Sequence, residues 1–210
     1  ITESTGTKYG AFYASFLDEK TIEARGLKPL MADVAKVRAI KSRKDFTHYM
    51  GTTGGAFGIG MVDMTVEPDT ADPTLNVLWV YQSGIGMPER DYYLTAQFAK
   101  QREAYQAYMV RTLKTIGDPA PAKTAAAIMA FETAIAEKSW TAADRRDVDK
   151  INNPMSSAEL AAYAPGIDLT AYFAGAGIPA QKRLLVSEKS AVRDLAAIYA
   201  KTPLATLKAW

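Results

Sequence analysis

The segment 56–82 breaks an otherwise helical sequence pattern, and it constrains the fold more than any other feature. Glycines are frequent from Gly51 to Gly60, where they weaken any helix. Two apolar segments follow, Ile59–Val66 and Leu75–Tyr81, and the turn-rich stretch Glu67–Pro73 separates them. This pattern predicts one antiparallel β-hairpin, at about residues 56–82, inserted in a mainly α-helical chain.

Apolar residues at helical spacing predict helices on both sides of this hairpin. Before it, the stripe Tyr9–Leu17 predicts an amphipathic helix over about residues 8–24, and Pro29 and Ser42 begin two further helices. After it, the predicted helices cover residues 95–116 and 122–138 and four shorter segments that begin near Ser156, Asp168, Val192 and Thr202. We therefore expect a mainly α, multi-helix lobe in which the aromatic stripes form core rather than a ligand platform.

The last predicted helix carries Leu204, Leu207 and Trp210 at helical spacing, with no capping residue or polar tail after them. One interpretation is that these side chains form an exposed apolar face, which packs on a further part of a longer protein. The alternative is that they dock on the core of this chain itself. The sequence favours the first interpretation.

The scarcity of histidine and cysteine limits the chemistry of this chain, which has one histidine, His48, and no cysteine. A catalytic zinc needs three protein ligands, and the H-E-x-x-H motif of zinc peptidases needs two histidines on one helix. A zinc peptidase site within residues 1–210 is therefore excluded, as are thiol nucleophiles and disulfides. No serine lies in a G-x-S-x-G motif that His48 could serve, and Gly58–Gly60 lacks the third glycine of a phosphate-binding loop. We assign no catalytic and no metal-ligating residue.

Charged residues of both signs are mixed along the sequence, and the net charge is +2. This balance gives no electrostatic reason to expect nucleic acid or an anionic membrane as a partner, and no apolar run is long enough to span a bilayer. Glu67, Asp69 and Asp72 lie at turn positions, where carboxylates commonly bond local backbone groups. The dense groups Arg90-Asp91 and Asp144–Asp147 favour internal ion pairs over a site for an anion or a peptide carboxylate.

Several segments, taken in order, resemble one known family. The string Ile85-Gly86-Met87-Pro88-Glu89-Arg90-Asp91-Tyr92-Tyr93 is similar to the Leu-Gly-Leu-Pro-x-Arg-Asp-Tyr-Tyr segment of the neprilysin and endothelin-converting-enzyme family of zinc metallopeptidases. Further similar segments are Gly10–Glu19, Ile22–Leu30, Trp140–Met155 and Thr202–Trp210. The residues that match the family motifs are Gly86, Pro88, Arg90, Asp91, Tyr92, Tyr93, Arg146, Asp147, Asn153 and Met155. We expect them to have a structural role, and Asn152 departs from the tyrosine that the family usually has.

The resemblance implies that residues 1–210 are a single N-terminal helical region of a larger, bacterial oligoendopeptidase-like metallopeptidase. In the family this lobe covers the catalytic domain, and the two enclose a cavity that admits peptides and excludes folded proteins. The H-E-x-x-H helix, the third zinc ligand and the substrate-binding strand all lie C-terminal to this region, so no catalytic residue carries over. The resemblance therefore implies no cofactor in this chain, one zinc ion in the full-length parent, and the C-terminal catalytic domain and peptide substrates as partners.

The sequence and the resemblance also suggest a source and a compartment, and they leave an alternative function open. Animal members of the family are disulfide-bonded, so a cysteine-free member suggests a bacterial protein, and the family's habits favour a periplasmic or otherwise exported one. The alternative is a free-standing, non-catalytic helical module, derived from the same lobe, that binds peptides or proteins. The reading frame after Trp210 separates the two: H-E-x-x-H downstream supports the peptidase, and a stop codon supports the module.

Overall fold

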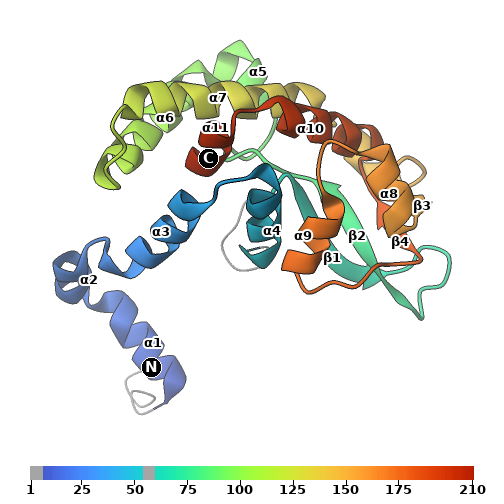
Figure 1. Cartoon of the computed structure of the whole chain (residues 1–210), viewed down its shortest axis with the longest axis horizontal. Helices are drawn as coiled ribbons and strands as arrows, with labels where there is room; N and C mark the ends of the chain where they lie inside the picture. The colour runs from blue at the N-terminus through green and yellow to red at the C-terminus, as the bar shows by residue number, and fades with distance from the viewer. Residues whose placement is uncertain (1–6, 54–59) are drawn as a thin grey trace. The chain divides into compact units, whose positions relative to one another are not determined.

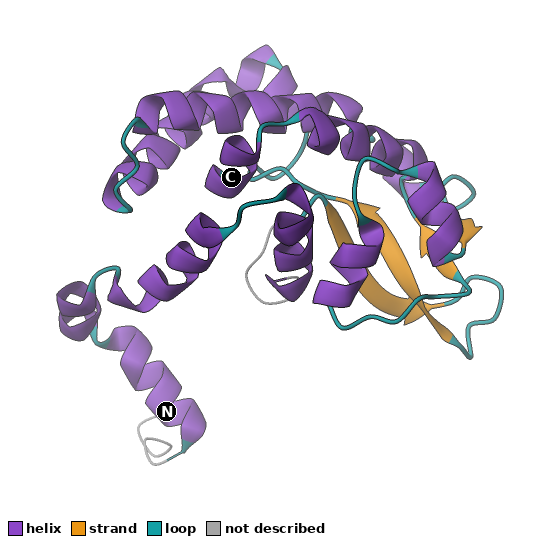
Figure 2. Cartoon of the chain, viewed as in Figure 1, coloured by secondary structure: helices purple, strands orange, loops and turns teal. Residues whose placement is uncertain are grey.

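The computed structural model describes residues 7–53 and 60–210 and divides the chain into two compact units (Figure 1). Unit 1 ends at Ala39, and unit 2 runs from Ile40 to Trp210. Helices dominate both units, as the sequence predicts, and all strands of the described residues belong to unit 2 (Figure 2). The assignment of the whole chain to a single lobe stays a prediction.

Unit 1 consists of short helices that have almost no core of their own. They are α1 (Lys8–Leu17), α2 (Glu19–Arg25), the 3-10 helix η2 (Lys28–Leu30) and α3 (Met31–Ala39). Asp18 separates the first two, because its side chain accepts a hydrogen bond from the Thr21 amide (3.1 Å) and so caps α2. The single helix predicted over residues 8–24 is therefore two helices. Gly10 is the only buried residue of these four helices.

Unit 2 is built around one long helix, α7 (Pro121–Lys138), which begins at a proline as the first helical turn favours. Helices α5 (Asp91–Leu94), α6 (Ala99–Thr115), α10 (Lys189–Lys201) and α11 (Leu204–Ala209) all contact it (Figure 1). The remaining helices are α4 (Arg43–Thr53), η3 (Ala96–Phe98), η4 (Asp144–Arg146), α8 (Ser157–Tyr163) and α9 (Leu169–Gly175). The predicted caps are present, because Ser156 forms a capping box with Glu159, and Asp168 accepts from the Ala171 amide.

The sheet of unit 2 contains the predicted hairpin and extends beyond it. Its described strands are β1 (Val62–Pro68), β2 (Asn76–Gln82), β3 (Asn153–Met155) and β4 (Leu184–Val186), in the order β1-β2-β4-β3. β1 and β2 are antiparallel, with Val62 opposite Gln82, while residues 56–59 of the predicted hairpin lie outside the described residues. β4 runs parallel to β2, and β3 pairs antiparallel with β4. The described sheet therefore contains two strands beyond the predicted hairpin, β3 and β4.

The main core lies between this sheet and helices α4, α7, α9 and α10. Its fully buried members include Val80, Ile135, Leu195 and Leu207. The predicted exposed face at the chain end is wrong, because Leu207 is buried and Leu204 and Trp210 pack against the same core. The Trp210 ring meets Phe131 edge to face, with 5.3 Å between ring centroids. The alternative interpretation, docking on the chain's own core, is the one that the structure supports.

Carboxylates fix the tip of the hairpin at two of the three predicted turn positions, Asp69 and Asp72. The prediction is wrong for Glu67, which lies in β1 and accepts from the Tyr81 hydroxyl (3.0 Å). Asp69 accepts from the Ala71 amide (2.8 Å), and Asp72 accepts from the Thr74 amide (3.0 Å). Arg183 donates two hydrogen bonds to the buried Asp69 carboxylate, at 2.5 and 2.8 Å. These bonds lower the pKa of Asp69 to about 2, and they tie the hairpin to the segment that leads into β4.

Candidate functional site

The motif string Ile85–Tyr93 forms the corner that leads from β2 into α5. The buried Tyr93 hydroxyl accepts a hydrogen bond from the Met87 amide (2.9 Å) and donates one to Glu132 on α7 (2.7 Å). Gly86 has no room for a side chain, because an added Cβ would collide with the Tyr105 hydroxyl. Glycine at this position therefore permits the close approach of the corner to α6. The hydrogen bond from the Met87 amide to the Tyr93 hydroxyl joins the two ends of the corner.

The charged residues of the string hold the same corner from outside. Arg90 donates to the Ala136 carbonyl of α7 (3.1 Å), and its guanidinium lies 3.7 Å from the half-exposed Asp91 carboxylate. Arg102 on α6 donates to the Tyr92 carbonyl (2.8 Å), near the end of α5 where carbonyl groups lack helical partners. Pro88 is exposed. These contacts are internal, so the corner offers no free arginine fork for a peptide carboxylate.

A buried carboxylate, Glu132, connects this corner to the rest of unit 2. Its oxygens accept from Tyr93, from the Tyr105 hydroxyl (3.2 Å) and from the Trp210 indole nitrogen (3.1 Å), while its side chain is 1% exposed. No lysine or arginine of the described residues forms an ion pair with it. Burial raises the pKa of Glu132, and the three hydrogen bonds oppose that rise. Burial and the Glu132 charge raise the pKa of Tyr93 and of Tyr105.

Sequence reasoning did not single out Glu132, although the sequence does carry a signal for it. It is the only charged residue between Lys123 and Glu137, in a helix whose other inward positions are apolar. A lone acid on the core face of a helix needs hydrogen-bond donors, since an unpaired buried charge is costly. The donors come from α5, α6 and the chain end, which lie far away in sequence.

The second motif segment ties the connection after α7 to the sheet. Asn153 donates its side-chain amide to the carbonyl oxygens of Lys150 (2.6 Å) and Val186 (3.0 Å), and Met155 pairs with Leu184 in the sheet. Lys150 also lies 3.6 Å from the Asp147 carboxylate. All of these contacts are made within the chain, and those of Asn153 and Met155 join the connection to β4.

The ion pair that engages the buried Glu188 carboxylate is made by the half-exposed Arg145, the residue before the motif arginine. Its guanidinium donates to Glu188 (2.8 Å), whose side chain is buried and also accepts from the Gln82 amide (2.8 Å). Arg146 itself is exposed. The Gln82 side chain accepts from the Trp140 amide (2.7 Å), so the end of β2 meets this connection directly. Ion pairs were predicted for the group Asp144–Asp147, and the structure shows them for Asp144, Arg145 and Asp147.

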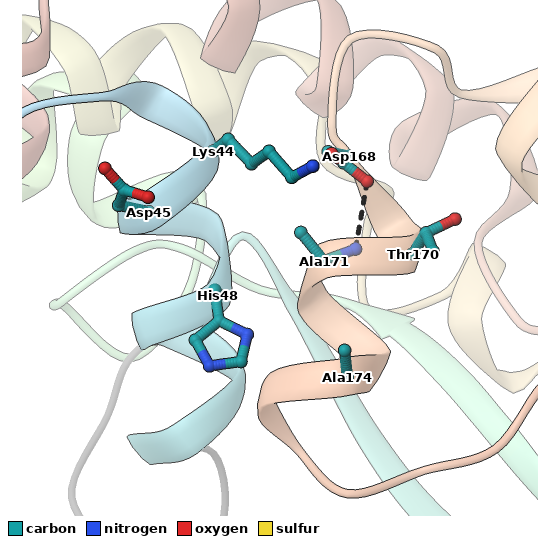
Figure 3. A pocket seen from close by; sticks show the side chains of 7 residues that line it. All are labelled: Lys44, Asp45, His48, Asp168, Thr170, Ala171 and Ala174. Carbon is teal, nitrogen blue, oxygen red and sulfur yellow. Dashed lines mark hydrogen bonds between the residues drawn. The ribbon is translucent and has the colours of Figure 1, made fainter.

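His48 lines a hollow of about 460 Å³ between α4 and α9 (Figure 3). Its lining residues are Lys44, Asp45, His48, Asp168, Thr170, Ala171 and Ala174. Lys44 extends toward Asp168, whose carboxylate is already engaged as the cap of α9 (Figure 3). The lining contains no serine or cysteine, and its one threonine, Thr170, points away from His48 (Figure 3).

Metal binding and membrane crossing also find no support in the part of the chain that the structure describes. Within residues 7–53 and 60–210, histidine, aspartate and glutamate side chains nowhere gather in a group of three that could hold a metal ion. Among the same residues no helix is both long and apolar enough to cross a membrane. The candidate site that the described residues offer is therefore the corner at Ile85–Tyr93, which hydrogen bonds to α6 and α7 hold in place.

Comparison with known proteins identifies the family of this chain. The model of the N-terminal region of peptidase family M13 matches residues 2–210. The chain belongs to peptidase family M13. Endothelin-converting enzyme 1 of Rattus norvegicus, a relative of this chain, is 27% identical over 209 residues, and that of Bos taurus is 31% identical over 171 residues. The family predicted from the motif segments is therefore confirmed.

Solved structures agree with this membership of family M13. The open state of zinc metalloprotease Zmp1 from Mycobacterium tuberculosis matches 94% of this chain at 30% identity, with a TM-score of 0.87. The inhibitor complex of Zmp1 gives a TM-score of 0.88 at 29% identity. PepO from Lactobacillus rhamnosis, at 17% identity and a TM-score of 0.71, shares the fold.

This chain accounts for only part of each relative. It spans 27% of the rat endothelin-converting enzyme and 23% of the bovine one. It spans 31% of Zmp1 and 30% of PepO. The chain therefore corresponds to less than a third of the length of its M13 relatives.

Proposed function

We propose that this chain is the N-terminal lobe of a zinc-dependent metalloendopeptidase that hydrolyses peptides. The observation that supports this most directly is the match of the M13 model to residues 2–210, together with the likeness to zinc metalloprotease Zmp1. The lobe encloses the substrate cavity and packs on a C-terminal catalytic domain of the same protein. That domain holds the single zinc ion, because the described residues of this chain offer no ligand set for it.

The residues of this chain contribute enclosure rather than chemistry. The corner at Gly86–Tyr93, the Glu132 hydrogen bonds and the Arg145–Glu188 pair hold α5, α6, α7 and the sheet in one arrangement. A stiff wall of this kind excludes bulk water and limits which substrates reach the reacting groups. The motif residues therefore act by fixing the shape of the lobe, and none of them touches the scissile bond.

Peptide hydrolysis by the full-length protein tests this proposal. We expect the purified protein to cleave a short unstructured peptide, to lose that activity with a zinc chelator, and to regain it when zinc is restored. The same target sequence inside a stably folded domain should resist cleavage, since the cavity admits only peptides. The 210-residue chain alone is the matched control and should show no hydrolysis.

Three outcomes contradict the proposal. Hydrolysis that a chelator leaves unchanged would show that the activity does not depend on zinc. Hydrolysis by the 210-residue chain alone would show that this chain itself carries the catalytic residues. A stop codon directly after Trp210, with no H-E-x-x-H downstream, would support the free-standing binding module instead.

We infer further that the parent protein is bacterial and works in the periplasm or outside the cell. The cysteine-free sequence fits a bacterial member of the family. Fractionation of the native host should find the full-length protein outside the cytoplasm, and recovery with a cytoplasmic marker enzyme would refute the inference.

A further inference from the structure

The sheet of unit 2 has a free edge at β1, the outermost of its described strands. β1 pairs with β2 on one side, while its other side meets no strand of the described residues (Figure 2). The N–H and C=O groups along such an edge pair readily with an added strand, and proteins therefore charge, cap or cover most edges. The backbone groups that β1 leaves open decide what this edge can bind.

The register of the hairpin identifies the backbone groups that face outward from β1. Asp69 donates to the Leu75 carbonyl (2.9 Å), and residues of an antiparallel pair alternate between bonding each other and facing away. The odd-numbered residues of β1 therefore bond β2, and the even-numbered ones, such as Val66, face outward. The same alternation holds in β2, where the Val80 carbonyl turns away from β1 and accepts from the Ser187 amide (2.9 Å).

Both ends of the outward-facing edge are closed by the chain itself. At one end, the Val62 carbonyl accepts from the Tyr172 hydroxyl (3.0 Å). Next to it, the Met64 amide donates to the neighbouring Asp63 carboxylate (2.8 Å). At the other end, Pro68 has no amide proton to donate. A long strand therefore cannot pair along the whole of β1.

The middle of the edge stays open at Val66. Its N–H and C=O groups, together with the Met64 carbonyl, have no hydrogen-bond partner in the described part of the chain. The Val66 side chain is 70% exposed. The open part of the edge therefore fits a short extended segment, whose backbone bonds Val66 and whose side chain packs on it.

The side chains beside the open groups are acidic. Asp63 is exposed and Glu67 is partly exposed, and neither forms an ion pair with a lysine or arginine of the described residues. One oxygen of Glu67 accepts from the hydroxyls of Thr65 (2.5 Å) and Tyr81 (3.0 Å). Successive side chains of a strand alternate between its faces, so the two acids share one face and Val66 lies on the other.

These acids argue against a second copy of this chain as the occupant of the edge. An antiparallel pair of β1 strands with Val66 of one copy opposite Met64 of the other places Glu67 opposite Asp63 on both sides. Like charges directly opposite each other destabilise strand pairing, whereas opposite charges stabilise it. A segment with basic side chains at these two positions therefore fits the edge better than another β1 does.

We propose that the edge of β1 at Val66 binds an extended basic peptide segment by strand addition. Its lysine or arginine side chains lie toward Asp63 and Glu67, and an apolar side chain lies toward Val66. The backbone hydrogen bonds supply affinity, and the alternation of basic and apolar residues supplies specificity. The inference rests on the proposed function in one respect, because it takes the occupant to be a segment of a peptide substrate.

Binding of a labelled peptide tests this site without relying on hydrolysis. The probe is fluorescein-labelled Lys-Val-Lys-Val-Lys, which places valine opposite Val66 and lysine opposite both Asp63 and Glu67. Glu-Val-Glu-Val-Glu with the same label is the matched control. Fluorescence anisotropy is measured as the 210-residue chain is added to each peptide. We expect the lysine peptide to bind about tenfold more tightly or better, with an affinity that falls as the salt concentration rises.

Variants of β1 separate strand addition from simple attraction of a basic peptide. Val66→Pro removes the open N–H but leaves the hydrogen bonds to β2, because this N–H faces away from β2. It should weaken binding of the lysine peptide about tenfold, while Val66→Thr, which keeps the N–H, should stay within about threefold of the wild type. Asp63→Asn combined with Glu67→Gln removes both charges and keeps the hydrogen-bond acceptors. This double variant should also bind about tenfold more weakly and lose most of the salt dependence.

Several results overturn the proposal. Wild-type affinity in a folded Val66→Pro variant or in the double charge variant does so, as does equal binding of the two peptides. A dimer of the wild-type chain that Val66→Pro dissociates in analytical ultracentrifugation would make a second copy the occupant. Circular dichroism checks the fold of each variant, and the double charge variant decides the outcome if Val66→Pro does not fold. Zinc-dependent hydrolysis by the full-length protein is measured separately, and its absence refutes the proposed function whether or not the 210-residue chain binds the peptide.

Discussion

Units 1 and 2 are both helical, but their helices are stabilised by different means. Every large apolar side chain that is buried among the described residues belongs to unit 2, where α7 and the sheet provide a common core. Unit 1 exposes its apolar stripes instead, and its local signals, such as the Asp18 cap, determine only where helices begin and end. Helical sequence patterns therefore occur in both units, while the hydrophobic core that the described residues form belongs to unit 2.

The largest expected effect comes from the core of unit 2. Ile135→Ala removes a fully buried side chain from α7 and should lower the free energy of unfolding of the 210-residue chain by about 2–5 kcal/mol, because the cavity cannot fully collapse. Urea unfolding followed by circular dichroism measures the change. A cost below about 1 kcal/mol would mean that unit 2 is packed more loosely than its burial indicates.

The Glu132 hydrogen bonds should give the next largest effect. Glu132→Ala leaves the Tyr105 hydroxyl and the Trp210 indole without their acceptor, which should cost about 1–3 kcal/mol in the same urea experiment. Glu137→Ala is the matched control, because Glu137 is exposed on the same helix and should change stability by less than about 0.5 kcal/mol. Equal costs for the two variants would show that the buried carboxylate does not hold unit 2 together.

Lowering the pH should lower the stability of unit 2 by protonating Asp69. Its pKa in the folded protein is lowered to about 2, below the ordinary value of 3.8, because Arg183 bonds the ionised form. Asp69 therefore contributes stability above pH 3.8, and this contribution is lost as the pH falls from about 4 to about 2. Thermal unfolding across this range should show that the difference between the wild type and Asp69→Asn shrinks as the pH falls.

Asp33→Asn provides the control for this titration in unit 1. Its carboxylate forms an exposed pair with Lys36, and exposed pairs contribute little to stability. The wild type and Asp33→Asn should therefore unfold alike at every pH. If the unfolding temperatures of the wild type and Asp69→Asn differ by the same amount from pH 5 to pH 2, the ion pair of Asp69 with Arg183 does not stabilise unit 2.

Local chemistry explains what the sequence predicts well. The hairpin follows from the alternation of glycine-rich, β-branched and turn segments, and the caps at Ser156 and Asp168 follow from side chains that bond amides three residues on. The motif strings predict the family, because five segments keep their order and spacing. The sequence assigns no catalytic residue to this chain.

What the sequence does not predict depends on contacts between distant segments. The three-residue strand β3 is too short to show a period of two, and only its pairing with β4 makes it a strand. Glu132 connects distant segments because it accepts hydrogen bonds from Tyr93, Tyr105 and Trp210, which are far apart in sequence. The error at the chain end has the same origin: the spacing of Leu204 and Leu207 shows an apolar face but not which surface buries it.

The smallest expected effect is the one that tests unit 1 most sharply. Ile22→Ala removes from α2 the same group that Ile135→Ala removes from α7, yet Ile22 is half exposed. We expect it to change the stability of the 210-residue chain by less than about 0.5 kcal/mol, as surface substitutions do. If Ile22→Ala costs as much as Ile135→Ala, α2 is packed as tightly as α7 in the 210-residue chain, and the contrast in burial between the two units is wrong.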